Sequence, residues 1–202
     1  MKIPRVSDLD DPAITPRAEL VAALRAARPQ DPTLCEGWQA RHLAAHIVIR
    51  EGDPLAAVRA IARKEDAAVV RGDAVTTIRE YEALIDRIEQ GAPVWSPLGW
   101  SALPNVLEYL VHTADVQRGS ALPDTPTHLP PRVAAALWSS VKAMARLKTI
   151  RSDVGCILVV PGGPRAVVHR GETSQVVTGT ELELALWVSG RDEASLAVVT
   201  QG

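Results

Sequence analysis

Apolar residues recur at helical spacing over the first 150 positions of this chain, and this periodicity limits the fold more than any other feature of the sequence. Capping residues, prolines and glycines divide the pattern into expected helices at about residues 16–28, 38–52, 53–64, 73–90, 104–118 and 132–148. Because each of these segments has an apolar stripe to bury, we predict a mainly α fold whose helices share one core.

The pattern changes after Arg151, where short β-branched segments replace the helical spacing. Strands are expected at about residues 156–160, 165–170, 174–178 and 196–200, with a helix at 181–188. A tail of about 50 residues is marginal as an independent core. We therefore expect residues 1–150 to form a helical bundle and residues 151–202 to form a small C-terminal α/β segment that packs on it.

Composition excludes several classes of function. The chain is 47% hydrophobic and has a net charge of −2 with acids and bases interleaved, so it offers no basic stripe for nucleic acid. No apolar run approaches the ~20 residues of a membrane-spanning helix, and the first residues lack the apolar region of a secretion signal. The two cysteines, Cys35 and Cys156, form no CxxC pair. We expect a cytoplasmic protein with a small-molecule ligand.

Three residues have the chemistry and spacing of a metal site. Glu108 and His112 are four residues apart, so they lie on one face of the expected helix. His46 lies in an apolar helix, where a titratable side chain is unexpected. Binding to a metal ion would explain its presence there. Two imidazoles and one carboxylate leave open positions on a divalent ion, and open positions are what metal-assisted chemistry requires. The sequence therefore predicts a site formed by His46, Glu108 and His112.

Structural roles compete with this prediction. Asn105-Val-Leu-Glu108 also matches a capping box, in which Glu108 would bind the Asn105 amide. His112 could be a buried neutral histidine satisfied by a hydrogen bond. Asp115 could orient an imidazole from behind, or it could pair with Arg118 three residues along the helix.

Two further residues of the second helix are candidates for the same site. His42 is four residues from His46, so we consider it a substitute ligand, although its place near the helix start suggests exposure. Arg50 lies one turn beyond His46 and could contact an anion at the site or face solvent. Arg118 is a similar candidate at the end of the other helix. Cys35 is interpreted as a structural cysteine, because no basic residue adjoins it in sequence.

Three segments resemble the DinB-like superfamily, and within it the mycothiol-dependent maleylpyruvate isomerase family: Leu34-Cys-Glu-Gly-Trp38, Arg41-His-Leu-Ala-Ala-His46 and Glu108-Tyr-Leu-Val-His112-Thr-Ala-Asp115-Val-Gln-Arg118. In that family a four-helix bundle holds a divalent metal, typically zinc, and the positions that match its ligands are His46, Glu108 and His112. The C-terminal segment resembles the small sterol-carrier-like α/β domain that follows the bundle. One departure is His42, where relatives carry an acid.

The resemblance implies a zinc-binding, actinobacterial protein that uses mycothiol. The hypothesis is that the metal lowers the pKa of the bound thiol, and that the thiolate adds to an electrophilic substrate in an isomerisation or a transfer. Glu108 would then be a ligand and not a general base. Two alternatives remain open, namely a non-enzymatic module with a structural metal and a bundle without metal.

Overall fold

The structure, a computed structural model, describes residues 16–52, 66–93, 95–96, 103–123, 129–192 and 195–201, with the side chains of residues 103 and 104 excepted. The chain divides into two units, Met1–Pro126 and Thr127–Gly202. The described residues form seven helices and one four-stranded sheet. This confirms a mainly α protein with a C-terminal α/β part. None of the described helices is both long enough and apolar enough to cross a membrane.

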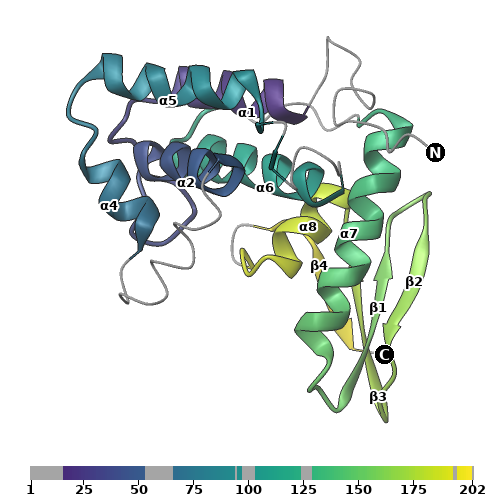
Figure 1. The fold of residues 1–202 in the computed structure, drawn as a ribbon. Helices are drawn as coiled ribbons and strands as arrows, with labels where there is room; N and C mark the ends of the chain where they lie inside the picture. The colour runs from purple at the N-terminus through teal and green to yellow at the C-terminus, as the bar shows by residue number, and fades with distance from the viewer. Residues whose placement is uncertain are drawn as a thin grey trace. The chain divides into compact units, whose positions relative to one another are not determined.

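The first unit is helical (Figure 1). Its described helices are α1 (Pro16–Ala26), α2 (Ala40–Gly52), α4 (Ala67–Asp73), α5 (Ile78–Gln90) and α6 (Leu103–Gly119). Helix α1 packs against α5 and α6, while α2 packs against α4 and α5. The core contains large apolar side chains from four of these helices: Leu20, Leu24, Leu43, Ile47, Ile85, Ile88 and Val116. The helices predicted at residues 16–28, 38–52 and 104–118 are therefore confirmed, with ends shifted by up to two residues. The segment predicted at 53–64 lies outside the described residues.

The helix predicted at residues 73–90 begins later than expected. Helix α4 ends at Asp73, and α5 begins at Ile78. The Thr77 hydroxyl accepts the Glu80 amide hydrogen at 3.2 Å, and the Glu80 carboxylate accepts the Thr77 amide hydrogen at 2.9 Å. This reciprocal capping box fixes the start of α5. The predicted start was wrong because Val75, which is buried without being helical, fits the apolar stripe.

The second unit combines two helices with a mixed sheet (Figure 1). Its elements are α7 (Pro131–Thr149), β1 (Val154–Val159), β2 (Arg165–His169), β3 (Thr173–Thr178), α8 (Glu181–Val188) and β4 (Val198–Gln201). The strand order is β2-β1-β3-β4, in which β1 and β3 are parallel and the two outer pairs are antiparallel. These elements confirm the strands and the helix predicted after residue 151, with small shifts at their ends.

The long helix α7 belongs to this second unit. Its buried stripe includes Leu137, Val141 and Ala145, and it packs against α8, β1 and β2. The chain thus divides before this helix, whereas the sequence analysis placed the division after it, near residue 150. The physical reason is that an apolar stripe shows that a helix must be buried but does not show which partner buries it.

A short turn in the first unit lies against the C-terminal end of α6. An isolated antiparallel bridge between its end residues closes this segment, which we call the 32–39 turn. The Leu34 amide donates a hydrogen bond to the carbonyl oxygen of Asp115 at 3.0 Å. Gly119 allows this approach, because a Cβ atom at that position would lie 2.4 Å from the Cα of Thr33.

We expect Gly119→Ala to destabilise the protein by about 1–3 kcal/mol, because the added methyl group must displace the backbone of the 32–39 turn. Gly52→Ala is the matched control, since Gly52 also ends its helix and, among the described residues, a Cβ there would meet only the Arg87 side chain at 3.6 Å. That substitution should be neutral or stabilise by about 0.4–1 kcal/mol. Urea unfolding followed by circular dichroism measures both, and equal effects would contradict the close approach.

Candidate metal centre

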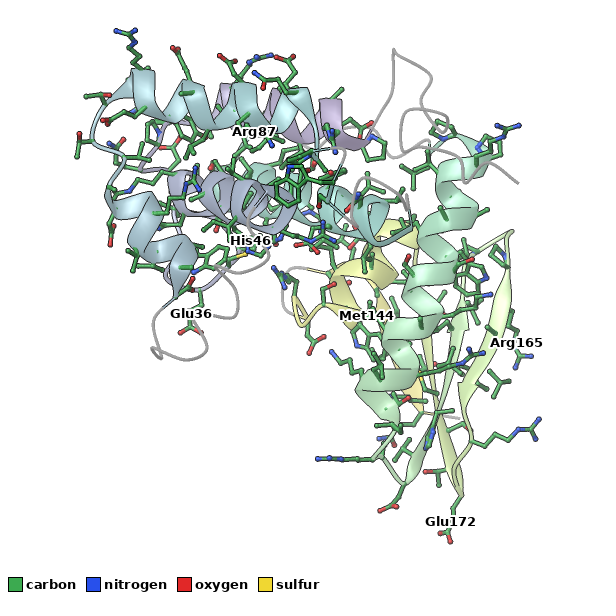
Figure 2. All side chains as sticks on the ribbon, viewed as in Figure 1. Glu36, His46, Arg87, Met144, Arg165 and Glu172 are labelled. Atoms are coloured by element: carbon green, nitrogen blue, oxygen red, sulfur yellow. The ribbon has the colours of Figure 1, made fainter. Side chains whose placement is uncertain are left out.

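The three predicted metal ligands meet in the first unit. His46 projects from α2 (labelled in Figure 2), and Glu108 and His112 project from α6. The Nε2 atoms of His46 and His112 lie 2.9 Å and 3.1 Å from the same atom, Glu108 Oε1. The centroids of the two imidazole rings are 5.2 Å apart. One donor atom from each residue lies within 4.8 Å of the others, so a single ion could contact all three.

Glu108 does not act as a helix cap. Helix α6 begins at Leu103, so Asn105 lies inside the helix instead of at its cap position. The Glu108 carboxylate faces the two histidines and Arg50, whose Nε lies 3.5 Å from Oε2. Arg50 also donates from Nη1 to Asn105 Oδ1 at 2.6 Å. The capping-box interpretation of Glu108 is therefore wrong. Arg50 lies beside the cluster and does not simply face solvent, which is the position that an anion contact at the site would require.

Asp115 lies behind His112 and is fully buried. Its Oδ2 atom is 2.7 Å from Nδ1 of His112. Because a carboxylate only accepts, Nδ1 must carry the hydrogen, and Nε2 is the nitrogen that faces Glu108. A carboxylate that binds the outer nitrogen of a histidine is the common support of a metal ligand. Asp115 thus has the orienting geometry that the sequence analysis weighed against an ion pair with Arg118.

The electrostatics of the cluster suit a cation. Burial raises the pKa of Glu108, but hydrogen bonds from His112 and His46 outweigh this effect and hold the pKa below its usual value. Burial lowers the pKa of His112, but its hydrogen bonds with Asp115, Cys35 and Glu108 raise it well above the usual value. A protonated His112 would balance the negative charges of Asp115 and Glu108. Metal binding would displace that proton and supply the positive charge in its place.

His42 is directed away from this cluster. The Gln39 amide donates to Nδ1 of His42 at 2.9 Å, so the other nitrogen carries the hydrogen and donates to Asp73 Oδ1 at 3.0 Å. The residue is 5% exposed, not solvent-facing as expected, and its ring packs closely against Gly72 of α4. With both nitrogens engaged at the start of α2, His42 is not placed to be a substitute ligand.

Two residues of the 32–39 turn contact the site although no sequence pattern indicated them, namely Trp38 and Cys35. The indole ring of Trp38 lies 5.3 Å from the His46 ring, measured between centroids. The thiol of Cys35 lies 3.2 Å from Asp115 Oδ2. No local pattern joins Cys35 to Asp115, which is 80 positions away. The signal available in the sequence was that each of the two residues lies in a segment that resembles the family. Arg118 lies in the last turn of α6, and its contact with an anion stays a prediction.

Comparisons with known proteins find one matching family model and a similar fold. Residues 12–96 match the family model described as the mycothiol maleylpyruvate isomerase N-terminal domain, which includes His46 but neither Glu108 nor His112. The fold is similar to the crystal structure of the mycothiol-dependent maleylpyruvate isomerase, with a TM-score of 0.58, 17% identity, and coverage of 93% of this chain and 88% of the other. A histidine-to-alanine mutant of that isomerase gives a TM-score of 0.58 at 16% identity, with the same coverage. Among curated proteins no match is found.

Proposed function

We propose that the chain is a DinB-like protein of the maleylpyruvate isomerase family and that it binds one divalent metal ion through His46, Glu108 and His112. The observation that carries the proposal is the convergence of both Nε2 atoms on one oxygen of Glu108. Zinc is the proposed ion, because nitrogen and oxygen ligands suit it and the family typically holds it. Iron(II) accepts the same ligand set.

The finer description of the fold is part of this proposal. The first unit is proposed to be a DinB-like four-helix bundle of α1, α2, α5 and α6. Its support is that α1 packs on α5 and α6, that α2 packs on α5, and that the His46 to Glu108 contact joins α2 to α6. The second unit is proposed to be sterol-carrier-like, on the basis of its mixed sheet with α7 and α8.

The proposed activity is a mycothiol-dependent isomerisation or thiol transfer on an electrophilic small molecule in the cytoplasm. When bound, the ion would lower the pKa of a coordinated thiol. Asp115 holds the hydrogen on Nδ1 of His112, which directs Nε2 into the site. Arg50 lies beside Oε2 of Glu108, whereas both histidines meet Oε1, and Arg50 in turn donates to Asn105. Glu108 is proposed to act as a ligand and not as a general base.

A structural metal in a non-enzymatic binding module is the competing function. Structural zinc sites are closed by four protein ligands, whereas catalytic sites keep a position for another molecule. Among the described residues, the group that contains His46 and Glu108 has three members. His42, which could have closed the site, is engaged elsewhere. The open site favours the enzymatic proposal.

Metal analysis followed by spectroscopy tests this function. We expect about one ion per purified chain, and we expect added mycothiol to change the visible spectrum of the cobalt-substituted protein through a new sulfur-to-cobalt band. Cys35→Ser protein should be used as well, because it removes the thiol nearest the site. An S-methylated thiol is the matched control.

Two outcomes would count against the proposal. Absence of a stoichiometric ion would remove the metal centre itself. An unchanged cobalt spectrum at millimolar thiol would leave the metal in place but would argue for the non-enzymatic module.

A further inference from the structure

We propose that Cys35 is a positioning residue of the metal centre, whose thiol holds Asp115 in the orientation that presents His112 to the metal. This inference rests on the proposed function, because it concerns the affinity of the same ion. It assigns a role to a side chain that the sequence pattern indicated only as a structural cysteine.

One oxygen atom connects the thiol to the imidazole. Asp115 Oδ2 lies 3.2 Å from Cys35 Sγ and 2.7 Å from His112 Nδ1. Both contacts are donations to the carboxylate, since an ionised carboxylate has no hydrogen to give. Cys35, Asp115 and His112 also offer donor atoms that lie within 4.8 Å of one another. A change at the sulfur can therefore reach the metal ligand through the oxygen atom that the thiol and the imidazole share.

Burial makes this contact consequential. Asp115 is 0% exposed, and a buried carboxylate depends on hydrogen bonds to replace the water that it has lost. If the thiol is removed, Oδ2 loses a donor and the carboxylate can rotate away from the geometry that fixes Nδ1 of His112. The expected consequence is a less well oriented imidazole and weaker metal binding, as for other groups that support a ligand from behind.

The 32–39 turn delivers the sulfur to this position. The Cys35 amide donates to Thr33 Oγ1 at 3.2 Å, and the Trp38 amide donates to the Cys35 carbonyl oxygen at 2.9 Å. The Leu34 amide donates to the backbone carbonyl oxygen of Asp115 itself. The turn is thus bound to α6 next to Asp115, and the thiol is held there by backbone contacts on both sides.

A double-mutant cycle on zinc affinity tests the proposal. Competition with a chromophoric chelator measures the Kd for zinc of the full-length wild type, Cys35→Ala, Asp115→Ala and the double variant. We expect a loss of about 10- to 100-fold for Asp115→Ala and about 3- to 10-fold for Cys35→Ala. On the Asp115→Ala background, Cys35→Ala should have a much smaller effect, because the carboxylate through which the thiol is proposed to position His112 is already removed. Cys35→Ser, which keeps a donor, should recover most of the affinity.

The outcomes separate the two proposals. If the wild type binds one ion but Cys35→Ala leaves the Kd unchanged, or lowers the affinity equally on both backgrounds, the positioning role is overturned and the proposed function stands. If the wild type binds no ion, the proposed function fails first. If Asp115→Ala does not fold, the role of Cys35 can be tested in the zinc-bound Cys35→Ala protein. The measurement is the rate, by NMR, at which the Nδ1 hydrogen of His112 exchanges with solvent. Faster exchange with solvent supports the role, and an unchanged rate overturns it.

Discussion

Replacing His112 with alanine should weaken metal binding by about 10²- to 10³-fold, the largest effect expected of any substitution at the site. The variant loses the Nε2 donor, and it also leaves Asp115 and Glu108 without the imidazole that bonds to both. Metal content of the purified protein and chelator competition provide the measurements. The wild type should also show a melting temperature that rises with zinc concentration, and His112→Ala should lose this dependence.

His42→Gln is the matched control for that experiment. His42 is a buried histidine of α2 at ligand spacing from His46, yet its nitrogens bind the Gln39 amide and Asp73. The variant is expected to be less stable but to keep wild-type metal content. Loss of metal in His42→Gln with retention in His112→Ala would reverse the assignment of the ligands.

Arg17→Met should destabilise the protein by about 3–5 kcal/mol, which is the second large effect. The Glu51 side chain is only 2% exposed, and Arg17 Nη2 lies 3.3 Å from its Oε1. The Tyr109 hydroxyl donates to the same carboxylate and accepts from Arg17 Nη2 at 2.5 Å. Removal of the guanidinium would leave a buried carboxylate without its main counter-charge, and urea unfolding measures the cost.

This cost should depend on pH. Burial raises the pKa of Glu51 and the charge of Arg17 opposes the rise, so the pKa in Arg17→Met should be higher still. A carboxyl group whose pKa is higher in the folded than in the unfolded state loses stability as the pH rises, because the folded state then holds the extra proton. The destabilisation should therefore be larger at pH 8 than at pH 5.

The double variant Arg17→Met/Glu51→Met is the control for the ion pair. It removes both charges together, so it should be more stable than Arg17→Met alone at neutral pH. A double variant as unstable as the sum of the two single variants would show that packing, and not the unpaired charge, causes the loss. Because Glu51 and Tyr109 directly follow Arg50 and Glu108 in sequence, this network also joins α2 to α6 beside the proposed metal centre.

Local sequence patterns predicted the helices, and the shared helix face of Glu108 and His112, because in these cases a single element contains the whole signal. The four-residue spacing of Glu108 and His112 places them on one face of α6 in any packing. The same kind of signal failed where two interpretations share one spacing. Whether Glu108 is a cap or a ligand depends on where α6 begins, which the spacing does not show. His42 and His46 are likewise at ligand spacing, but His42 packs against α4 and bonds to Asp73.

The sequence by itself determined that the chain is mainly helical, that its last third contains strands, and that His46, Glu108 and His112 are candidate ligands. Only the tertiary structure decided that α7 belongs with the sheet, that Asp115 supports His112, and that Cys35 reaches Asp115. The physical reason is range. Helical periodicity and capping act over a few residues, whereas a hydrogen bond across 80 positions exists only after the packing of separate elements has placed its two ends together.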